Sequence, residues 1–234
     1  MLRHPGPAWA HGNFDNSARS AARVGLRRQQ KLDRSNRILE VARTRFQSEG
    51  YDSVTIESIA AEAELSAVTI YNYYGTKANL LLELVKESDV RLLAQLRALT
   101  DDLPDDIVDA VAKFGKIMRH HAMTYLAKST WREVLAASIL QGGGQFGTTY
   151  RALDRALVVV MAKLVLSYQR RGTLCRRIDA RAFADTLYEM QNIRFFLFIS
   201  DHTQDEEEAD IRFRRDLGLI FADKAPLKIL RGKS

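Results

Sequence analysis

The sequence predicts an all-α fold, and three observations lead to this prediction. Apolar residues recur at intervals of three and four along most of the chain, which is the spacing of one helix face. No stretch of useful length alternates between apolar and polar residues, as a half-buried strand would. No proline stands between Asp105 and Ala225, so nothing of that kind interrupts long helices there. A chain of 234 residues is long enough for one or two domains with a buried core.

The first four expected helices have recognisable ends. Residues 35–49 carry an apolar stripe at intervals of four, and Gly50 is a suitable helix stop. Each of the next three helices is expected to follow a hydroxyl side chain that caps its first turn. These caps and helices are Thr55 before residues 56–63, Ser66 before residues 67–73, and Thr76 before residues 77–99.

Five more helical patterns follow. Three glycines at residues 142–144 separate the second from the third, and Gly172 ends the third. The glycine run lacks the lysine and hydroxyl residue of a phosphate-binding loop, so we interpret it as a flexible connection. The expected helices span residues 105–126, 130–140, 148–171, 179–199 and 205–221.

Residues 1–32 show no sustained apolar periodicity and are rich in Gly, Ala, Arg and Ser. We expect most of this segment to be a basic, disordered arm. The alternative is a basic helix formed on contact with a polyanion, because four cationic residues recur there at intervals of four. They are Arg19, Arg23, Arg27 and Lys31. A basic tail is expected at residues 223–234.

The chain has a net charge of +6 and one cysteine, Cys175. The basic balance permits a polyanionic partner without requiring one. A single cysteine excludes an internal disulfide, which agrees with a reducing cytoplasm. The longest apolar runs are residues 156–162 and 195–199, far shorter than a membrane span. We therefore expect a cytoplasmic protein with no membrane partner.

Residues 54–77 carry the clearest functional motif. Two short helices are joined by a turn of three or four residues, which is the spacing of a helix-turn-helix. Ala60 is small enough for the second helix to cross closely, and Ile59 and Ile70 can fill the shared core. The second helix then presents short or polar side chains on its outer side, as contact with base edges and phosphates requires.

The motif resembles the tetracycline-repressor (TetR) family of bacterial regulators over about residues 35–99. About nine elements of the family pattern occur in order without a gap. They are Gly50-Tyr51, Thr55, Ile59-Ala60, Ser66, Thr69-Ile70-Tyr71, Tyr73-Tyr74 and Thr76-Lys77.

The resemblance implies a helix-turn-helix DNA-binding domain at residues 33–78 and a helical ligand-binding and dimerisation domain at residues 79–222. It implies phosphate contacts from Thr55, Tyr71, Tyr73 and Lys77, and a core position for Tyr74. The short side chains at the start of the second helix would face the major groove. The full set of expected DNA-binding residues is Thr55, Ser66, Ala67, Val68, Thr69, Tyr71, Asn72, Tyr73 and Lys77.

Three residues depart from the family pattern. Glu64 stands where the turn commonly has glycine, and a glutamate is uncomfortable at a positive φ. Val68 replaces a more usual glycine or lysine, and Asn79 replaces a frequent glutamate of the capping box. These departures leave the DNA-reading assignment in place but put the bases that are read beyond inference.

The function that the resemblance implies is a ligand-responsive transcriptional regulator, most often a repressor that a small molecule releases from its double-stranded operator. A largely apolar effector is expected, with no cofactor. Candidate lining residues are concentrated between charged helix faces. They are Phe114, Met118, His121, Tyr125, Trp131, Leu135 and Tyr150.

A homodimer joined through residues 148–171 and 179–199 is expected, because both segments are apolar over more than one stripe. Burial of that surplus by the helix at residues 205–221 is the alternative.

A helical enzyme or small-molecule carrier is the competing class of function. No nucleophile, base and acid are grouped, and no dinucleotide fingerprint is present. No metal site is expected, because His120 and His121 are adjacent and point about 100° apart on a helix.

Overall fold

The computed structural model describes residues 13–222, and its side chains from residue 23 onward. This range forms nine α-helices and no strand, which confirms the all-α class. The sequence segments expected to be helical agree with the helices to within a few residues, except for the first. The helices are α1 (Asn13–Ser48), α2 (Ile56–Glu62), α3 (Ala67–Tyr74), α4 (Lys77–Asp101), α5 (Ile107–Tyr125), α6 (Lys128–Leu140), α7 (Gln145–Arg171), α8 (Ala180–Ser200) and α9 (Glu206–Ile220).

Helix α1 has 36 residues and begins well before Ser35, where the sequence analysis placed its start. Residues 13–32 are therefore helical where a disordered arm was expected, and a helix that forms on contact with a polyanion stays a prediction. Alanine, arginine, glutamine and leucine are frequent there, and all are strong helix formers. Residues 23–34 are all exposed, and the buried positions that anchor α1 begin at Ile38. The remainder of the expected arm and the tail at residues 223–234 lie outside the described residues.

The predicted caps are present at the starts of α2, α3 and α4. The side chains of Thr55, Ser66 and Thr76 accept hydrogen bonds from the third residue of each helix. Asn79 does not return a bond to the backbone of Thr76, and its amide instead donates to the carbonyl oxygen of Tyr74 over 3.0 Å. The substitution of glutamate by asparagine therefore ties the end of α3 to the start of α4.

Two hydrophobic clusters stabilise the molecule, and α4 contributes to both. Residues 80–85 of α4 pack with α1, α2 and α3, together with parts of α6 and α8. Leu92, Leu96 and Leu99 of the same helix pack with α5, α7, α8 and α9. One continuous helix thus joins the core of the N-terminal helices to the core of the helical body.

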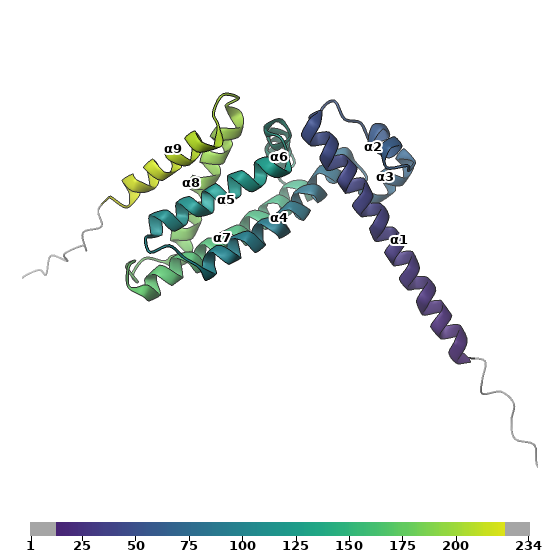
Figure 1. Ribbon diagram of the computed structural model, residues 1–234, viewed down its shortest axis with the longest axis horizontal. Helices are drawn as coiled ribbons and strands as arrows, with labels where there is room; N and C mark the ends of the chain where they lie inside the picture. Colours follow the sequence, from purple (N-terminus) through teal and green to yellow (C-terminus); the bar gives the residue numbers. More distant parts are fainter. Residues whose placement is uncertain (1–12, 223–234) are drawn as a thin grey trace, which may run out of the picture.

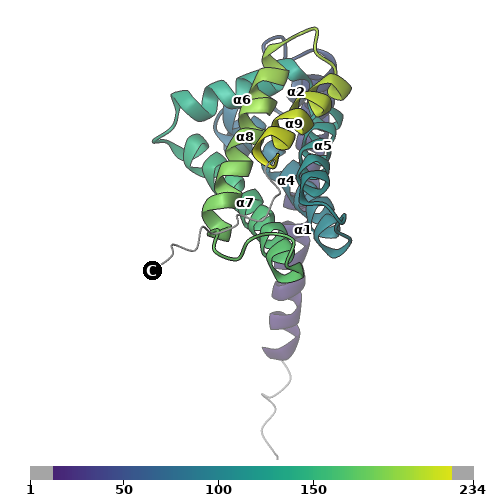
Figure 2. The same cartoon turned by 90° about the vertical axis from the view of Figure 1, so that its left-hand side faces the viewer.

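Figure 1 shows α1, α2 and α3 at one end of the molecule and the body of α4 to α9 at the other. The first half of α1 projects away from the rest of the chain. Helices α4 and α7 lie side by side, as do α5 and α9. Figure 2 views the body end-on, with α8 and α9 in front and α1 behind. Within the described range, no helix is long and apolar enough to cross a membrane.

Candidate nucleic-acid interface and ligand cavity

The turn between α2 and α3 has the hydrogen-bond pattern of a Schellman motif. The amide of Leu65 donates to the carbonyl oxygen of Ala60 over 2.9 Å, and the amide of Glu64 donates to that of Ala61 over 3.2 Å. This pattern places Glu64 in the left-handed region, with φ of 54°. The positive φ that the sequence raised as a concern is therefore present, and the glutamate adopts it. Ile59 and Ile70 are fully buried between the two helices, as expected.

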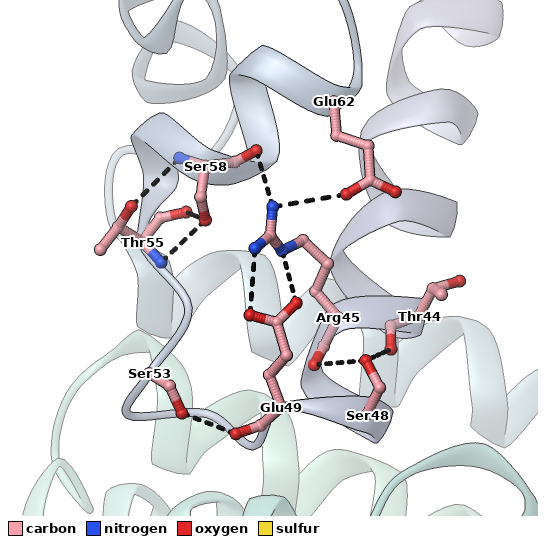
Figure 3. Close-up of polar contacts among 8 residues, drawn as sticks. All are labelled: Thr44, Arg45, Ser48, Glu49, Ser53, Thr55, Ser58 and Glu62. Carbon is pink, nitrogen blue, oxygen red and sulfur yellow. Dashed lines mark hydrogen bonds and ion pairs between the residues drawn. The ribbon is translucent and has the colours of Figure 1, made fainter.

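Arg45 of α1 fixes the position of α2, as Figure 3 shows. Its guanidinium forms an ion pair with Glu49 at 2.9 Å and donates to the carbonyl oxygen of Ser58 over 3.2 Å. It also approaches the carboxylate of Glu62 at 3.4 Å. On the far side of Ser58, a reciprocal capping box links its side chain and backbone to those of Thr55. The start of α2 is thereby held by both side-chain and backbone contacts.

The outer face of α3 is open to solvent. Val68 is 66% exposed, and Tyr71 and Asn72 are also exposed. Ala67 and Thr69 are partly buried, and the hydroxyl oxygens of Thr69 and Ser66 lie 2.8 Å apart. The residues of this face are small or polar and none is charged, which suits a helix that enters the major groove.

Three of the predicted phosphate-contacting residues line one surface depression beside α3. They are Thr55, Tyr71 and Lys77, and Thr76 at the start of α4 joins them. The hydroxyl oxygen of Thr55 accepts from the amide of Ser58, which leaves its hydrogen free to donate outward. The N-terminus of α4 adds the positive end of a helix dipole. The depression also includes the acidic side chains of Asp52 and Glu57.

Two of the predicted phosphate-contacting side chains have partners within the chain. The ammonium of Lys77 lies 4.1 Å from the centre of the Tyr51 ring, and burial lowers the pKa of this lysine. The hydroxyl of Tyr73 donates to the carbonyl oxygen of Lys31 over 3.3 Å, so Tyr73 packs toward α1 instead of the depression. Tyr74 is half-buried and shares a 2.8 Å hydrogen bond with Ser35, consistent with the core position expected for it.

The projecting part of α1 is basic and continues from the end of α3 where Tyr73 touches Lys31. Its exposed cationic residues are Arg23, Arg27, Arg28, Lys31 and Arg34. Of these residues, Lys31 contacts the end of α3 through Tyr73.

A second site lies in the helical body, where a cavity is enclosed by α4, α5, α6, α7 and α8. The space open to the centres of water molecules is about 40 Å³. That is room for roughly three waters, at about one per 10–15 Å³. Apolar and aromatic side chains make up most of the lining. Four of the seven residues predicted to line a pocket do so, namely Met118, His121, Trp131 and Tyr150.

The other three predicted lining residues do not reach the cavity. Phe114 is fully buried in the core of the body, and Leu135 packs against the N-terminal core cluster. The ring of Tyr125 stacks on that of His121 from behind, with centroids 6.1 Å apart. These three residues belong to α5 and α6, which both line the cavity, but they lie on faces of these helices that do not border it.

Sequence reasoning missed two acidic residues in the lining, Asp89 and Asp154. The sequence does contain a signal for both residues, because each acid interrupts an apolar stripe at helical spacing. Asp89 falls between Val85 and Leu92, and Asp154 falls between Tyr150 and Leu157. Tyr188 and Asn192 of α8 complete the polar part of the lining.

The helices predicted to form the dimer pack on each other and keep apolar side chains on the surface. On α8, Ile193, Phe196 and Leu197 are exposed at helical spacing, and Ile193 is 60% exposed. On α7, Val159 and Leu166 are exposed one heptad apart. Helix α9 packs mainly against α5 and leaves these side chains uncovered.

Comparison with known proteins assigns the N-terminal part of this arrangement. The family model described as bacterial regulatory proteins, tetR family, matches residues 38–84, which contain α2, α3 and the start of α4. This chain is a tetR-family protein. It is accordingly a DNA-binding transcriptional regulator. No protein with a curated description matches the chain.

Solved structures of other regulators resemble the tetR-family chain over most of its length. A tetR-family regulator from Pectobacterium atrosepticum has 21% identity and a TM-score of 0.66, covering 83% of this chain and 94% of its own. One from Mesorhizobium loti has 15% identity and a TM-score of 0.62, covering 82% and 96%. A transcriptional regulator from Saccharomonospora viridis, solved in complex with choline, has 20% identity and a TM-score of 0.61, covering 80% and 95%. At these identities the likeness establishes the fold.

Proposed function

We propose that this regulator is a homodimeric repressor that leaves its operator when a small molecule enters the cavity of the helical body. The observation that carries the proposal is the course of α4. The helix begins at the depression beside α3 with Thr76 and Lys77. About two to four turns later, the same helix forms one wall of the cavity with Val85, Ser88, Asp89 and Leu92.

The residues proposed to contact DNA are those that the family resemblance implies. Ala67, Val68, Thr69 and Asn72 would meet base edges, with Ser66 at the entry of the helix. Thr55, Tyr71 and Lys77 would hold backbone phosphates around the depression. Tyr73 would join them by exchanging its long bond to Lys31 for a phosphate oxygen. The basic part of α1 would track phosphates beyond the half-site.

Two copies are needed because one short recognition helix reads too few bases for specificity. The exposed apolar residues of α7 and α8 supply a surface for the second copy. In the dimer the two α3 helices must meet successive major grooves, about 34 Å apart. A ligand therefore weakens binding only if it favours a dimer in which this separation is wrong.

The body is suited to transmit such a change. The hydroxyl of Thr130 on α6 donates to the carbonyl oxygen of Phe46 on α1 over 3.0 Å, and the indole of Trp131 next to it lines the cavity. The choline complex of the Saccharomonospora regulator shows that this fold can hold a small molecule. The proposed regulator acts on the chromosome in the cytoplasm and catalyses no reaction.

Selection of bound sequences from a random duplex pool tests the proposal with the full chain. We expect enrichment of two related half-sites about 10 base pairs apart, and affinity that falls steeply as salt rises. A reporter gene placed behind the selected sequence should be silenced when the regulator is present. Enrichment of no sequence, or of unpaired half-sites, would contradict the dimeric reader, and activation of the reporter would contradict the repressor.

A further inference from the structure

Two carboxyl groups face the cavity, and one of them has no partner. Asp89 of α4 is 8% exposed, and within residues 23–222 no side chain forms a hydrogen bond or an ion pair with its carboxylate. Asp154 of α7 accepts a hydrogen bond of 2.7 Å from the hydroxyl of Tyr188. The lining contains no lysine and no arginine. A pair of buried acids with no cation in the lining is costly unless something neutralises it.

The two acids also affect each other. Burial raises the pKa of Asp89 to about 7, and the charge of Asp154 adds to this shift. Burial likewise raises the pKa of Asp154, against the hydrogen bond from Tyr188 and the charge of Arg155. Protonation of either acid relieves this repulsion. A bound positive charge would relieve it without protonation.

Aromatic side chains stand in the same lining. Trp131, Tyr150, Tyr188 and Phe195 come from three helices, and the rings of Trp131 and Phe195 meet edge to face with centroids 5.6 Å apart. The faces of such rings attract cations, and organic ammonium groups most of all because they are weakly hydrated. Carboxylates and aromatic rings together therefore favour a positively charged organic group.

Other classes of ligand fit less well. An anion would meet two carboxylates and no cationic side chain, since burial lowers the pKa of His121 and its Nε2 lies 2.8 Å from the hydroxyl of Ser88. A metal ion would need a third close ligand. Among the described residues, no three side chains of His, Cys, Asp or Glu are grouped to hold one.

We propose that the cavity binds an organic monocation, a protonated amine or a quaternary ammonium, with its charged head between Asp89 and Asp154. The role of this ligand as an effector rests on the function proposed above. The small free volume suits a compact head group, and a larger ligand would have to displace side chains of the wall. Because Asp89 belongs to α4, the attraction would act on the helix that begins at the DNA face.

Matched pairs of cations and neutral carbon isosteres test this inference. The probes are choline and benzyltrimethylammonium, each beside the compound in which carbon replaces nitrogen, 3,3-dimethylbutan-1-ol and neopentylbenzene. Calorimetry and thermal shift on the full chain would measure binding. We expect at least one cation to bind about tenfold or more tightly than its isostere. Asp89→Asn and Asp154→Asn should each weaken that cation by about tenfold.

Asp185→Asn is the matched control, because Asp185 lies on α8 outside the lining and pairs with Arg181. It should bind the cation as the unaltered chain does. Equal binding of cation and isostere, binding of neither cation, or unchanged affinity in both cavity variants would overturn the inference.

A parallel measurement on operator DNA separates this inference from the proposed function. Cation binding that leaves DNA affinity unchanged would support the cavity's ligand class and contradict effector control. Release of DNA by a neutral isostere alone would contradict the ligand class and support effector control.

Discussion

The guanidinium of Arg119, fully buried in α5, donates from Nε to the carboxylate of Asp210 on α9 over 2.9 Å. A second nitrogen of the same guanidinium also pairs with Asp210, and a third donates to Gln191 of α8 over 3.3 Å. Arg119 therefore ties three helices of the body together from within its core.

Removal of the Asp210 carboxylate should strongly destabilise the helical body formed by α4 to α9. Asp210→Ala leaves a buried arginine with one amide partner, and we expect the free energy of unfolding to fall by about 3 kcal/mol. Urea denaturation measures this. Asp185→Ala, which breaks an exposed ion pair on α8, should cost at most about 0.5 kcal/mol. Equal losses in the two variants would show that the buried pair contributes little.

The strained turn of the helix-turn-helix gives a prediction of opposite sign. Glycine adopts a left-handed conformation without the steric cost that glutamate has at φ of 54°. Glu64→Gly should therefore raise the free energy of unfolding by about 1 kcal/mol. Glu64→Ala keeps the strain and loses only the exposed ion pair with Arg37, so it should give no gain. Equal stability of the two variants, measured by thermal unfolding, would contradict this account.

Local sequence signals predicted the helices well because their ends depend on local chemistry. The first turns of α2, α3 and α4 are capped by the hydroxyls of Thr55, Ser66 and Thr76, each of which bonds a backbone amide three residues later. Helix α7 ends at Gly172, which adopts a left-handed conformation. The start of α1 was missed because no such local signal marks it. Its first half has no apolar stripe in the sequence, and residues 23–34 are exposed, whereas periodicity detects only helices that bury a face.

The cavity could be predicted only in part because it is made by side chains from five helices. Composition pointed to aromatic residues on the right helices, but the rotation of α5 decides that Met118 faces the cavity and Phe114 does not. Gly115 shows the same limit. A Cβ there would lie 2.6 Å from the ring of Phe213 on α9, a contact that no local pattern indicates.

Asp89 predicts a dependence of stability on pH. Its pKa is about 7 in the folded chain, against an ordinary value of 3.8, so the folded state holds a proton that the unfolded state releases. Its contribution to stability falls as pH rises from about 4 to about 7 and stays low above that. Asp89→Asn removes this loss and should stabilise the chain by about 2–4 kcal/mol at about pH 8.

Urea denaturation of both proteins over a pH series measures the difference. The other titratable groups that face Asp89 in the cavity, Asp154, His121, Tyr150 and Tyr188, are present in both proteins, so most of their effect cancels. At about pH 4 the two stabilities should converge, because Asp89 is then protonated in the folded state. A difference that does not grow with pH would contradict the assignment.

Lys77 should contribute to DNA affinity without regard to base sequence. Lys77 lines the depression beside α3, where a phosphate would add to the contact between its ammonium and the ring of Tyr51. Lys77→Ala should weaken binding to operator and random duplex alike and reduce the salt slope by about one unit. Lys86→Ala, farther along α4 and paired with Glu83, is the control and should leave the slope unchanged. Fluorescence anisotropy over a salt series distinguishes them.

The exposed apolar stripe of α8 should hold the dimer together. Phe196 and Leu197 are each 46% exposed in the single chain, and nothing in the described body covers them. A double substitution, Phe196→Glu with Leu197→Glu, would place two carboxylates opposite two more across a twofold axis. We expect the unaltered chain to sediment at twice its 26.5 kDa mass at micromolar concentration, and the double variant at 26.5 kDa.

Leu219→Glu is the control for that experiment, because Leu219 is an exposed apolar residue on α9, outside the predicted interface. It should stay dimeric. Far-ultraviolet circular dichroism would show that the monomeric variant keeps its helices, and its operator affinity should fall because a single α3 then reads one half-site. A monomeric unaltered chain would contradict the dimer and paired recognition helices together. A dimeric double variant would place the interface on another face of the body.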